Sequence, residues 1–446
     1  MTRFRFVMSS LGPLSGPVLV VGAGPAGATA ARTLAVAGVP VCLLDRSAFP
    51  RNKPCGGGIS ARVLRRFPYL EHELGSIATH HVSRLYLEGP RGESTLLKSD
   101  RPAALMIRRV EFDHLLVSLA LAAGAELVTG AEIVQARAEP DRVVLDARDG
   151  RRFEAPSVIA ADGVHSVIAR RLGLNAGWPA TSVALDMMEE TPRTTLRDLD
   201  PSTLWVAYGA GRGPATDGSG RRAAEGYAYV FPKRDHVNVG IGYVLSYYRQ
   251  SVDEAPYDVQ LGLIDALRRR GVLAGESVQR NFTPFLIPVG GPLREPGRGR
   301  VLLAGDAGGF VNGFTAEGIY YAMVSGDLAA RAVLDSSPDS LPTLARRYRR
   351  ACHYEIGAEL RDSVLLQRYL FADCRRIARV IEGAGCEQGI TQLVLDLAVG
   401  TRAYRDVRRR VLARSPLLAG RLVWERIRKK VLPEGRAGTR IRTVSE

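Results

Sequence analysis

Cysteine is scarce in this chain, and the few cysteines are too widely spread to build a shared site. There are five: Cys42, Cys55, Cys352, Cys374 and Cys386. None belongs to a CxxC pair, and no histidine pair stands nearby at zinc-binding spacing, so we expect neither a disulfide framework nor a metal site. Scattered free thiols are typical of a protein that works in a reducing cytosol.

Long uninterrupted hydrophobic runs are also missing. The best candidate, residues 18–44, is broken by Gly22, Gly24, Pro25, Gly27 and Arg32, which favours a strand, a turn, a helix and a second strand over a signal or a membrane span. No internal repeat stands out, and 46% hydrophobic with 24% charged residues is an ordinary globular composition. We therefore expect a cytoplasmic enzyme of two or three lobes without a transmembrane segment.

Acidic residues do not balance the basic ones, and the net charge is +15. Residues 401–446 hold fourteen Lys or Arg and four Asp or Glu, a net charge of +10. No nucleic-acid-binding motif accompanies this charge, so we expect no nucleic-acid partner. The stretch "RLVWERIRKKVL" within this tail is amphipathic at helical spacing. The basic tail either aids solubility and packs on its own protein, or makes the protein peripheral on the inner face of the membrane through anionic lipid.

A nucleotide-binding pattern opens the chain. The stretch "PVLVVGAGPAGATAARTLAVAGVPVCLLDR" predicts a strand, a glycine turn, an alanine-rich helix and a second strand ending in an acid. Glycines in such a turn allow the backbone and the helix N-terminus to approach a pyrophosphate, and the acid is placed for ribose hydroxyls. The residues expected to bind the nucleotide here are Gly22, Ala23, Gly24, Pro25, Ala26, Gly27, Asp45 and Arg46.

Two later strands also run into acidic turns, at Asp162 with Gly163 and at Gly305 with Asp306. Together with "RRVEFDHLL", which contains Arg109, they resemble segments of the FAD-binding glutathione-reductase-like superfamily. The resemblance implies FAD as cofactor, with Arg109 near its phosphates and Asp306 near its ribityl and pyrophosphate region. After Asp306 we expect a helix that begins near Thr315 and points its positive end at the flavin. Two further flavin contacts are expected in this helix, Gly318 and Ile319.

No second glycine motif of this kind follows residue 45, so we expect no dedicated NAD(P)H domain. Electrons would then reach the flavin at a shared or exposed site, from NAD(P)H or ferredoxin.

Three stretches, "RNKPCGGGIS", "GYAYVFPKRDHVNVGIG" and "GDAGGFVNGFTAEGIYYAMVSG", together resemble the geranylgeranyl reductase family of flavoproteins over roughly residues 16–335. The resemblance implies hydrogenation of isolated C=C bonds in prenyl chains of lipids, quinones or chlorophyll precursors. The family's Cys-Gly-Gly signature falls on Cys55, Gly56 and Gly57. Its aromatic signature falls on Tyr227, Tyr229, Phe231, Pro232, Gly240 and Gly242.

Departures from the family pattern occur at three positions. Tyr229 stands where the family usually has Trp, which leaves substrate identity or chain length open. Gly313 and Ala316 replace a Pro and a Gly in the turn before the flavin-facing helix.

Alternation in a strand puts Tyr227, Tyr229 and Phe231 on one face, where they could wall an apolar slot or simply pack a sheet face. Residues 56–58 lack Cβ atoms and would form a backbone edge beside the flavin, where Gly58 would contact the substrate. A mobile surface loop is the alternative for this stretch. An ordinary thiol carries its proton at neutral pH, so Cys55 would supply or relay a proton or position the alkene, unless it is only a small buried apolar residue.

The expected fold class is α/β: a Rossmann-like FAD-binding domain with an inserted antiparallel-sheet substrate domain and a helical C-terminal region. We assign residues 16–75, 105–180 and 290–337 to the first, 76–104 and 181–289 to the second, and 338–446 to the third. Strands of the substrate sheet are predicted at "VSRLYLEGP", "STLLKS", "TLWVAYG", "GYAYVFPK" and "VNVGIGYVL".

The leading functional hypothesis is an FAD-dependent reductase of isolated C=C bonds in polyprenyl lipid-like substrates. A flavin monooxygenase or halogenase would share the nucleotide motifs without needing "PCGGG" or the aromatic strand. A flavin-bearing redox carrier or sensor would need no apolar slot. The leading hypothesis requires Cys55 with its glycines and the aromatic strand to face one another across an apolar cavity.

Overall fold

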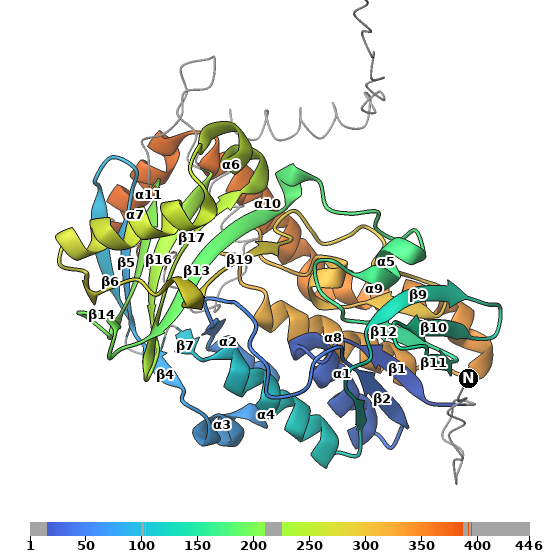
Figure 1. The fold of residues 1–446 in the computed structure, drawn as a ribbon. Coiled ribbons are helices and arrows are strands. Elements are labelled where there is room, and N and C mark those ends of the chain that lie inside the picture. Colours follow the sequence, from blue (N-terminus) through green and yellow to red (C-terminus); the bar gives the residue numbers. More distant parts are fainter. Residues whose placement is uncertain are drawn as a thin grey trace, which may run out of the picture.

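The computed structural model describes residues 16–99, 102, 104–209, 225–386, 391 and 394. A six-stranded sheet forms the half of the molecule that contains the glycine turn, in the order β20, β21, β12, β1, β2, β8 (Figure 1). Its strands are parallel except β20. The strands are β1 (Val18–Val21), β2 (Val41–Leu44), β8 (Glu126–Val128), β12 (Val158–Ala160), β20 (Gly297–Arg298) and β21 (Val301–Leu303).

Both faces of this sheet are covered, which explains why its strands are apolar on both sides. Three helices bury one face: α1 (Pro25–Val36), α4 (Arg109–Ala122) and α8 (Ile319–Leu334). A small antiparallel sheet and a short helix bury the other: β9 (Ile133–Ala138), β10 (Val143–Ala147), β11 (Arg152–Ala155) and α5 (Val167–Arg171). The predicted Rossmann-like arrangement is confirmed.

Glycine is required on steric grounds at two positions of the β1 to α1 turn. Gly22 has a φ of +94°, and a Cβ there would lie 2.3 Å from the Ala161 carbonyl oxygen. A Cβ on Gly27 would lie 1.8 Å from the Gly22 carbonyl oxygen. The turn therefore packs directly against β12 and against itself, which keeps the helix N-terminus close to the strand ends.

A seven-stranded sheet forms the other half, in the order β19, β13, β17, β16, β15, β5, β6. Its strands are β5 (Arg84–Glu88), β6 (Ser94–Lys98), β13 (Ala184–Pro192), β15 (Thr203–Tyr208), β16 (Gly226–Pro232), β17 (His236–Val244) and β19 (Phe282–Ile287). All five strands predicted from the sequence lie in this sheet. The pairing is antiparallel throughout except between β5 and β15, which run parallel, as the long connection between them permits.

Helices cover both faces of the large sheet (Figure 1). Helix α7 (Pro256–Arg269) packs on one face. On the other face lie α10 (Ala358–Phe371) and α11 (Cys374–Cys386), which continue the chain after α9 (Leu344–Cys352). The C-terminal region is thus helical as far as residue 386, as predicted. The amphipathic stretch predicted at "RLVWERIRKKVL" and the rest of the basic tail lie outside the described residues.

Short elements join the two halves. A three-stranded sheet of β3 (Gly58–Ser60), β7 (Ala104–Met106) and β4 (His80–Val82) follows the PCGGG stretch. The remaining α-helices and strands are α2 (Arg62–Arg66), α3 (Leu70–Glu73), α6 (Leu245–Ser251) and the strand pair β14 (Leu196–Asp198) with β18 (Leu273–Gly275). Within the described part of the chain, every helix is too short or too polar to cross a bilayer.

Candidate functional site

Asp45, the acid that follows β2, holds the glycine turn in place through hydrogen bonds. Asp45 Oδ2 accepts a hydrogen bond from the Ala23 N–H at 2.7 Å, and Oδ1 accepts from the Ser47 N–H at 2.8 Å. Arg46 is exposed to solvent, whereas Ala23, Pro25 and Ala26 are buried. The predicted contact of Asp45 with a ribose remains a prediction, and the structure adds a role in holding the turn.

Arg51 is a site residue that the sequence motifs do not mark. Its Nη1 lies 3.2 Å from Asp113 Oδ2 and its Nη2 lies 3.9 Å from Asp45 Oδ2. A Cβ on Gly24 would lie 3.7 Å from Nη2, so the guanidinium stands beside the turn where the pyrophosphate is expected. The only sequence signal was a basic residue between the terminal acid and the PCGGG stretch.

Arg109, expected near the phosphates, forms a buried pair with Asp113. Its Nε and Nη2 donate to the two carboxylate oxygens at 2.6 and 2.8 Å, and the side chains are 5% and 0% exposed. Burial alone would lower the pKa of Arg109, but Asp113 and, to a smaller extent, the Cys55 thiol raise it. Arg109 therefore links the nucleotide side of the molecule to Cys55.

The two later acidic turns are found at the strand ends, as predicted. Asp162 Oδ2 accepts from the Val167 and Ile168 N–H groups at the start of α5, at 2.8 and 3.3 Å. Its Oδ1 is buried and has no partner among the described residues, and burial raises the pKa of this carboxyl. Gly163 has a φ of +83° and open space where a Cβ would stand. Asp306, on the turn after β21, lies 4.0 Å from Lys53 Nζ.

The helix expected to begin near Thr315 begins at Ile319, with Gly318 as its N-cap. Asn312 Oδ1 accepts from the Phe314 and Thr315 N–H groups at 2.9 and 3.0 Å, and Ala316 has a φ of +56°. These features hold residues 312–316 in a turn, so the helix starts four residues later than predicted.

The described residues fit an FAD molecule. The turn at residues 22–27 offers a backbone cradle for a phosphate, and Gly163 leaves open space beside it. Asp162 offers a buried oxygen that can accept a hydrogen bond, and Arg51 offers a positive charge.

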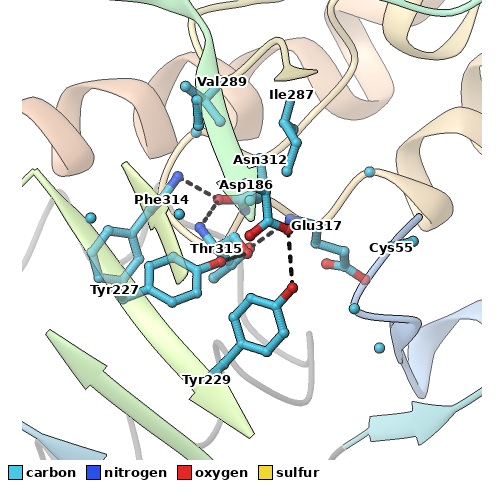
Figure 2. A pocket seen from close by; sticks show the side chains of 18 of the residues that line it. Cys55, Asp186, Tyr227, Tyr229, Ile287, Val289, Asn312, Phe314, Thr315 and Glu317 are labelled. Atoms are coloured by element: carbon cyan, nitrogen blue, oxygen red, sulfur yellow. Dashed lines mark hydrogen bonds between the residues drawn. The ribbon is translucent and has the colours of Figure 1, made fainter. Parts of the chain in front are cut away.

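The thiol and glycine stretch and the aromatic strand line the same cavity, of about 210 Å³ (Figure 2). A Cβ on Gly56 would lie 3.0 Å from two atoms of the Phe231 ring. Gly57 has a φ of +74°, and a Cβ there would lie 2.1 Å from the Ile107 carbonyl oxygen. At Gly58 an added Cβ would make only ordinary contacts, so space among the described residues does not require glycine at that position.

The PCGGG stretch is held by specific bonds. Asn238 Nδ2 on β17 donates to the Cys55 carbonyl oxygen at 3.1 Å, and the Ile107 N–H donates to the Gly57 carbonyl oxygen at 2.9 Å. The Gly57 N–H donates to Cys55 Sγ at 3.4 Å. The half-buried Cys55 is therefore fixed between the large sheet and β7, and these bonds argue against a mobile loop.

The aromatic wall consists of Tyr227, Tyr229 and Phe231, which share one face of β16 as predicted. The ring centroids of Tyr229 and Phe231 are 4.4 Å apart, and those of Tyr227 and Tyr229 are 6.3 Å apart. The Tyr227 hydroxyl donates to the Thr315 carbonyl oxygen at 2.7 Å. Pro232 ends the strand and is buried away from the cavity lining. The wall thus meets the turn that precedes α8.

Comparison with known proteins identifies the family. The model of the FAD binding domain family matches residues 15–237. Geranylgeranyl diphosphate reductase of Rhodobacter capsulatus is 31% identical over 369 residues, which cover 80% of this chain and 85% of that protein. The chain belongs to the geranylgeranyl reductase family of FAD-dependent oxidoreductases.

Further relatives and a solved structure agree with this membership. Menaquinone reductase of Mycobacterium tuberculosis is 32% identical over 336 residues, covering 72% of this chain and 77% of that protein. The crystal structure of a geranylgeranyl bacteriochlorophyll reductase-like protein from Thermoplasma acidophilum has the same fold, with a TM-score of 0.71, 21% identity and coverage of 89% of this chain and 99% of that one. This protein is therefore an FAD-binding oxidoreductase of the family.

Asp186 is an acid in this cavity that the family signatures did not reveal. It lies on β13, lines the cavity and is 5% exposed. The Tyr229 hydroxyl donates to its Oδ2 at 3.0 Å, as Figure 2 shows. Burial raises the pKa of Asp186 to about 7, against the opposing effects of Tyr229 and the Met187 N–H. The sequence signal was a single charged residue in the apolar stretch "VALDMM".

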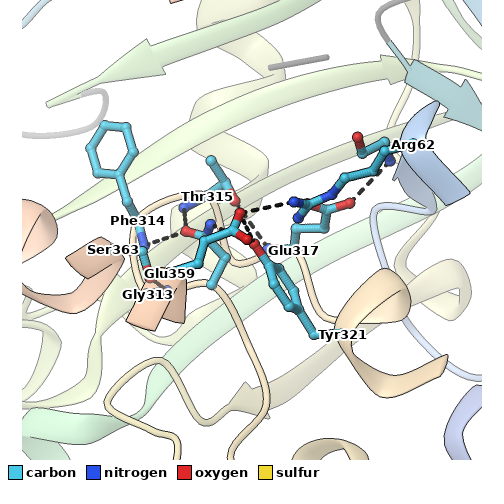
Figure 3. A network of polar contacts seen from close by, with 10 residues as sticks. Arg62, Gly313, Phe314, Thr315, Glu317, Tyr321, Glu359 and Ser363 are labelled. Carbon is cyan, nitrogen blue, oxygen red and sulfur yellow. Dashed lines mark hydrogen bonds and ion pairs between the residues drawn. The ribbon is translucent and has the colours of Figure 1, made fainter. Parts of the chain in front are cut away.

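A second acid of the cavity, Glu317, belongs to an ion network around Arg62 (Figure 3). Arg62 Nη2 lies 3.4 Å from Glu317 Oε2, and its Nη1 donates to Glu359 Oε1 at 2.8 Å. The Tyr321 hydroxyl also donates to Glu359 Oε1, at 2.8 Å. Burial raises the pKa of Glu317, and Arg62 opposes that shift. The network ties α2 to α8 and α10 beside the cavity.

Proposed function

We propose that this protein uses FAD to saturate isolated C=C bonds in geranylgeranyl or other polyprenyl chains of a lipid, quinone or chlorophyll-type substrate. The supporting observation is that Cys55 with its glycines and the aromatic wall of β16 line the same cavity. The names of the relatives, which refer to geranylgeranyl diphosphate and menaquinone, support the same chemistry.

The cavity suits an apolar chain. Besides the aromatic wall, its apolar lining includes Phe285 and Ile287 of the edge strand β19, Val289 shortly after that strand, and Phe314 of the turn before α8. Such a surface binds hydrocarbon by excluding water and offers few polar groups to compete with it. A halogenase or monooxygenase would need room for a different substrate, and a redox carrier would need no such slot.

An isolated alkene has no carbonyl group to accept electrons, so its reduction needs a hydride at one carbon and a proton at the other. Reduced FAD, when bound, supplies the hydride. The narrow edge at residues 56–58 lets the alkene come within the roughly 3 to 3.5 Å that a reaction requires. Cys55, fixed beside this edge, supplies or relays the proton or positions the alkene.

Two further parts of the proposal concern partners. The electron donor is NAD(P)H or ferredoxin. A polyprenyl substrate resides in a bilayer, so the basic C-terminal region would make peripheral contact with the inner face of the membrane.

An anaerobic experiment tests the proposal. The flavin of the purified protein is reduced without oxygen, and geranylgeranyl diphosphate, which has no quinone ring that could accept the electrons, is then added while the flavin absorbance is followed. Reoxidation that depends on the alkene, with products heavier by two hydrogens per bond, is the expected result. Reoxidation only after oxygen is admitted would favour a monooxygenase or halogenase, and no response to either would favour a redox carrier.

A further inference from the structure

Three neighbouring strands of the large sheet bring Asp186 and Tyr229 together over a pair of glycines. In the strand register, Asp186 on β13 stands opposite Gly242 on β17, and Tyr229 on β16 stands opposite Gly240 on the same strand. A Cβ on Gly240 would lie 2.4 Å from the Tyr229 hydroxyl oxygen, and one on Gly242 would lie 3.4 Å from Asp186 Oδ1. The Tyr229 side chain therefore reaches Asp186 across β17 because β17 carries no side chain at either point.

The two oxygens of Asp186 have different surroundings. Oδ2 accepts the Tyr229 hydrogen bond, whereas Oδ1 is buried and has no hydrogen-bond partner among the described residues. The neighbouring strand β19 presents Phe285 opposite Asp186, and the titratable groups beyond Tyr229 are Tyr227 and the Cys55 thiol, which interact with Tyr229. A buried carboxylate oxygen without a donor is costly, and a proton on Oδ1 removes that cost.

Two other acids line the cavity, Glu317 and Glu225, and Asp186 differs from Glu317 in its partners. Glu317 has Arg62 as a partner and accepts from the Ser60 N–H at 3.0 Å, so its oxygens serve the network of Figure 3. Among the described residues, no cation forms an ion pair with Asp186. Burial also raises the pKa of Glu225, but Glu225 is less buried than Asp186. Asp186 is almost fully buried and accepts a hydrogen bond from Tyr229 of the aromatic wall, so its carboxyl group is the one placed to carry and release a proton at that wall.

We propose that Asp186 delivers the proton that completes saturation of the C=C bond, and that Tyr229 is the positioning residue that holds its carboxyl group. The inference rests on the proposed function and leaves Cys55 the role of positioning the alkene. It uses a residue outside the family's signatures and a tyrosine where those signatures usually have tryptophan.

The step balances in atoms and charge. One alkene carbon receives a hydride from the reduced flavin, and the π electron pair forms a C–H bond at the other carbon with the proton of Asp186. The O–H bond of the carboxyl breaks, which leaves a carboxylate that the Tyr229 hydroxyl stabilises through Oδ2. Water returns the proton before the next turnover.

The first test follows the carboxyl group itself, without turnover. Carboxyl carbons of aspartate are labelled with ¹³C in the protein with oxidised FAD, and their signals are followed by NMR as pH changes. We expect one signal that titrates near pH 7 and is absent from Asp186→Asn. In Tyr229→Phe this signal should titrate at higher pH, because the hydrogen bond that favours the carboxylate is lost. Titration of the Asp186 signal near its ordinary value of about 3.9 would overturn the inference.

The second test measures the chemical step. In a single anaerobic turnover with geranylgeranyl diphosphate, Asp186→Asn should slow alkene-dependent flavin reoxidation by about 100-fold or more, the usual contribution of a general acid. The wild-type rate should fall as pH rises through about 7, whereas the residual rate of the variant should lack this dependence. Asp198→Asn removes a buried carboxyl that pairs with Arg193 outside the cavity, and it should keep the wild-type rate.

The outcomes distinguish a failure of the inference about Asp186 from a failure of the proposed function. A wild-type rate in Asp186→Asn would overturn the inference while the proposed function stands. A wild-type protein that fails to reoxidise with any prenyl compound would overturn the proposed function, and the inference with it.

Discussion

Asn238 and Cys55 are separated by 183 positions in the sequence, yet the side-chain amide of Asn238 donates a 3.1 Å hydrogen bond to the Cys55 carbonyl oxygen. Asn238 is fully buried on β17, and Cys55 precedes β3. This bond attaches the thiol and glycine stretch to the large sheet. It therefore helps to hold the two walls of the cavity together.

Replacing Cys55 tests the role that the proposals leave to it. Cys55→Ala should bind FAD normally, because Gly22, Asp45 and Arg51 are untouched, but should need about tenfold more prenyl substrate for half-maximal flavin reoxidation if the thiol positions the alkene. The measurement is the anaerobic reoxidation rate against substrate concentration, with Cys386→Ala as control because that thiol is exposed on α11. A Cys55→Ala protein with full FAD content and unchanged kinetics would remove both proposed roles of the thiol.

Two glycine substitutions with opposite expected effects on the free energy of unfolding test the packing of the aromatic wall. Gly240→Ala should lower the free energy of unfolding by about 1 to 3 kcal/mol, because the new Cβ would stand 2.4 Å from the Tyr229 hydroxyl oxygen. Gly262→Ala on α7 meets no atom within 4 Å and should raise the free energy of unfolding by up to about 1 kcal/mol through helix propensity. Urea denaturation of the FAD-bound proteins measures both, and equal effects of the two changes would contradict the described geometry.

The buried carboxyl of Asp186 predicts a pH dependence of stability. Its pKa rises from 3.8 to about 7 on folding, so between these values the folded protein holds a proton that the unfolded chain has lost. The resulting stabilisation is complete below pH 3.8 and disappears as pH rises through 7, with a total of about 4 kcal/mol. Relative to wild type, Asp186→Asn should therefore be more stable at pH 8 than at pH 5.

Urea denaturation at pH 5 and pH 8 checks this prediction, with Asp265→Asn as control, because Asp265 is a half-buried acid of α7 that lies outside the cavity and pairs with Arg268. Asp265→Asn should change stability equally at both values. A constant difference between wild type and Asp186→Asn across this range would contradict the assignment.

Arg51 is expected to contribute to FAD affinity. Arg51→Ala removes a guanidinium held beside the glycine turn by Asp45 and Asp113, and the loss of one charge-assisted bond to a phosphate should weaken FAD binding at least about tenfold. Fluorescence titration of the apoprotein with FAD measures the affinity. Arg148→Ala removes an exposed arginine that pairs with Glu132 and should leave it unchanged, and equal affinity in both variants would exclude the contact.

Removal of Arg62 should destabilise the fold. Arg62→Met leaves Glu317 and Glu359 without their shared cation, and breaking such a poorly exposed ion pair typically costs about 3 kcal/mol or more. Chemical denaturation measures the loss. Arg91→Ala, which separates an exposed arginine from Glu93, should change stability by less than about 0.5 kcal/mol. Similar effects of the two substitutions would show that the network contributes little.

The elements that the sequence predicted well are those with strong local patterns. The apolar strands and glycine turn at residues 18–44 and the five strands of the large sheet were recovered because periodicity and turn chemistry are local properties. The start of α8 was predicted four residues too early. Asn312 and Ala316 hold the preceding residues in a turn, and the sequence of that turn does not mark where the helix begins. The parallel pairing of β5 with β15 was also missed, because nothing in a strand's own sequence records the direction of its neighbour.

The amino-acid sequence by itself determined the cofactor class, the family and the two stretches that line the cavity, because each is written in consecutive residues. Only the tertiary structure decided that Arg51 stands beside the glycine turn and that Asp186 meets Tyr229. Those contacts depend on strand register and on loops from distant segments, and a carboxyl group acquires an unusual pKa only when folding removes its water. The chemistry of the cavity's acid is therefore a property of the packed sheet, although each of its residues is visible in the sequence.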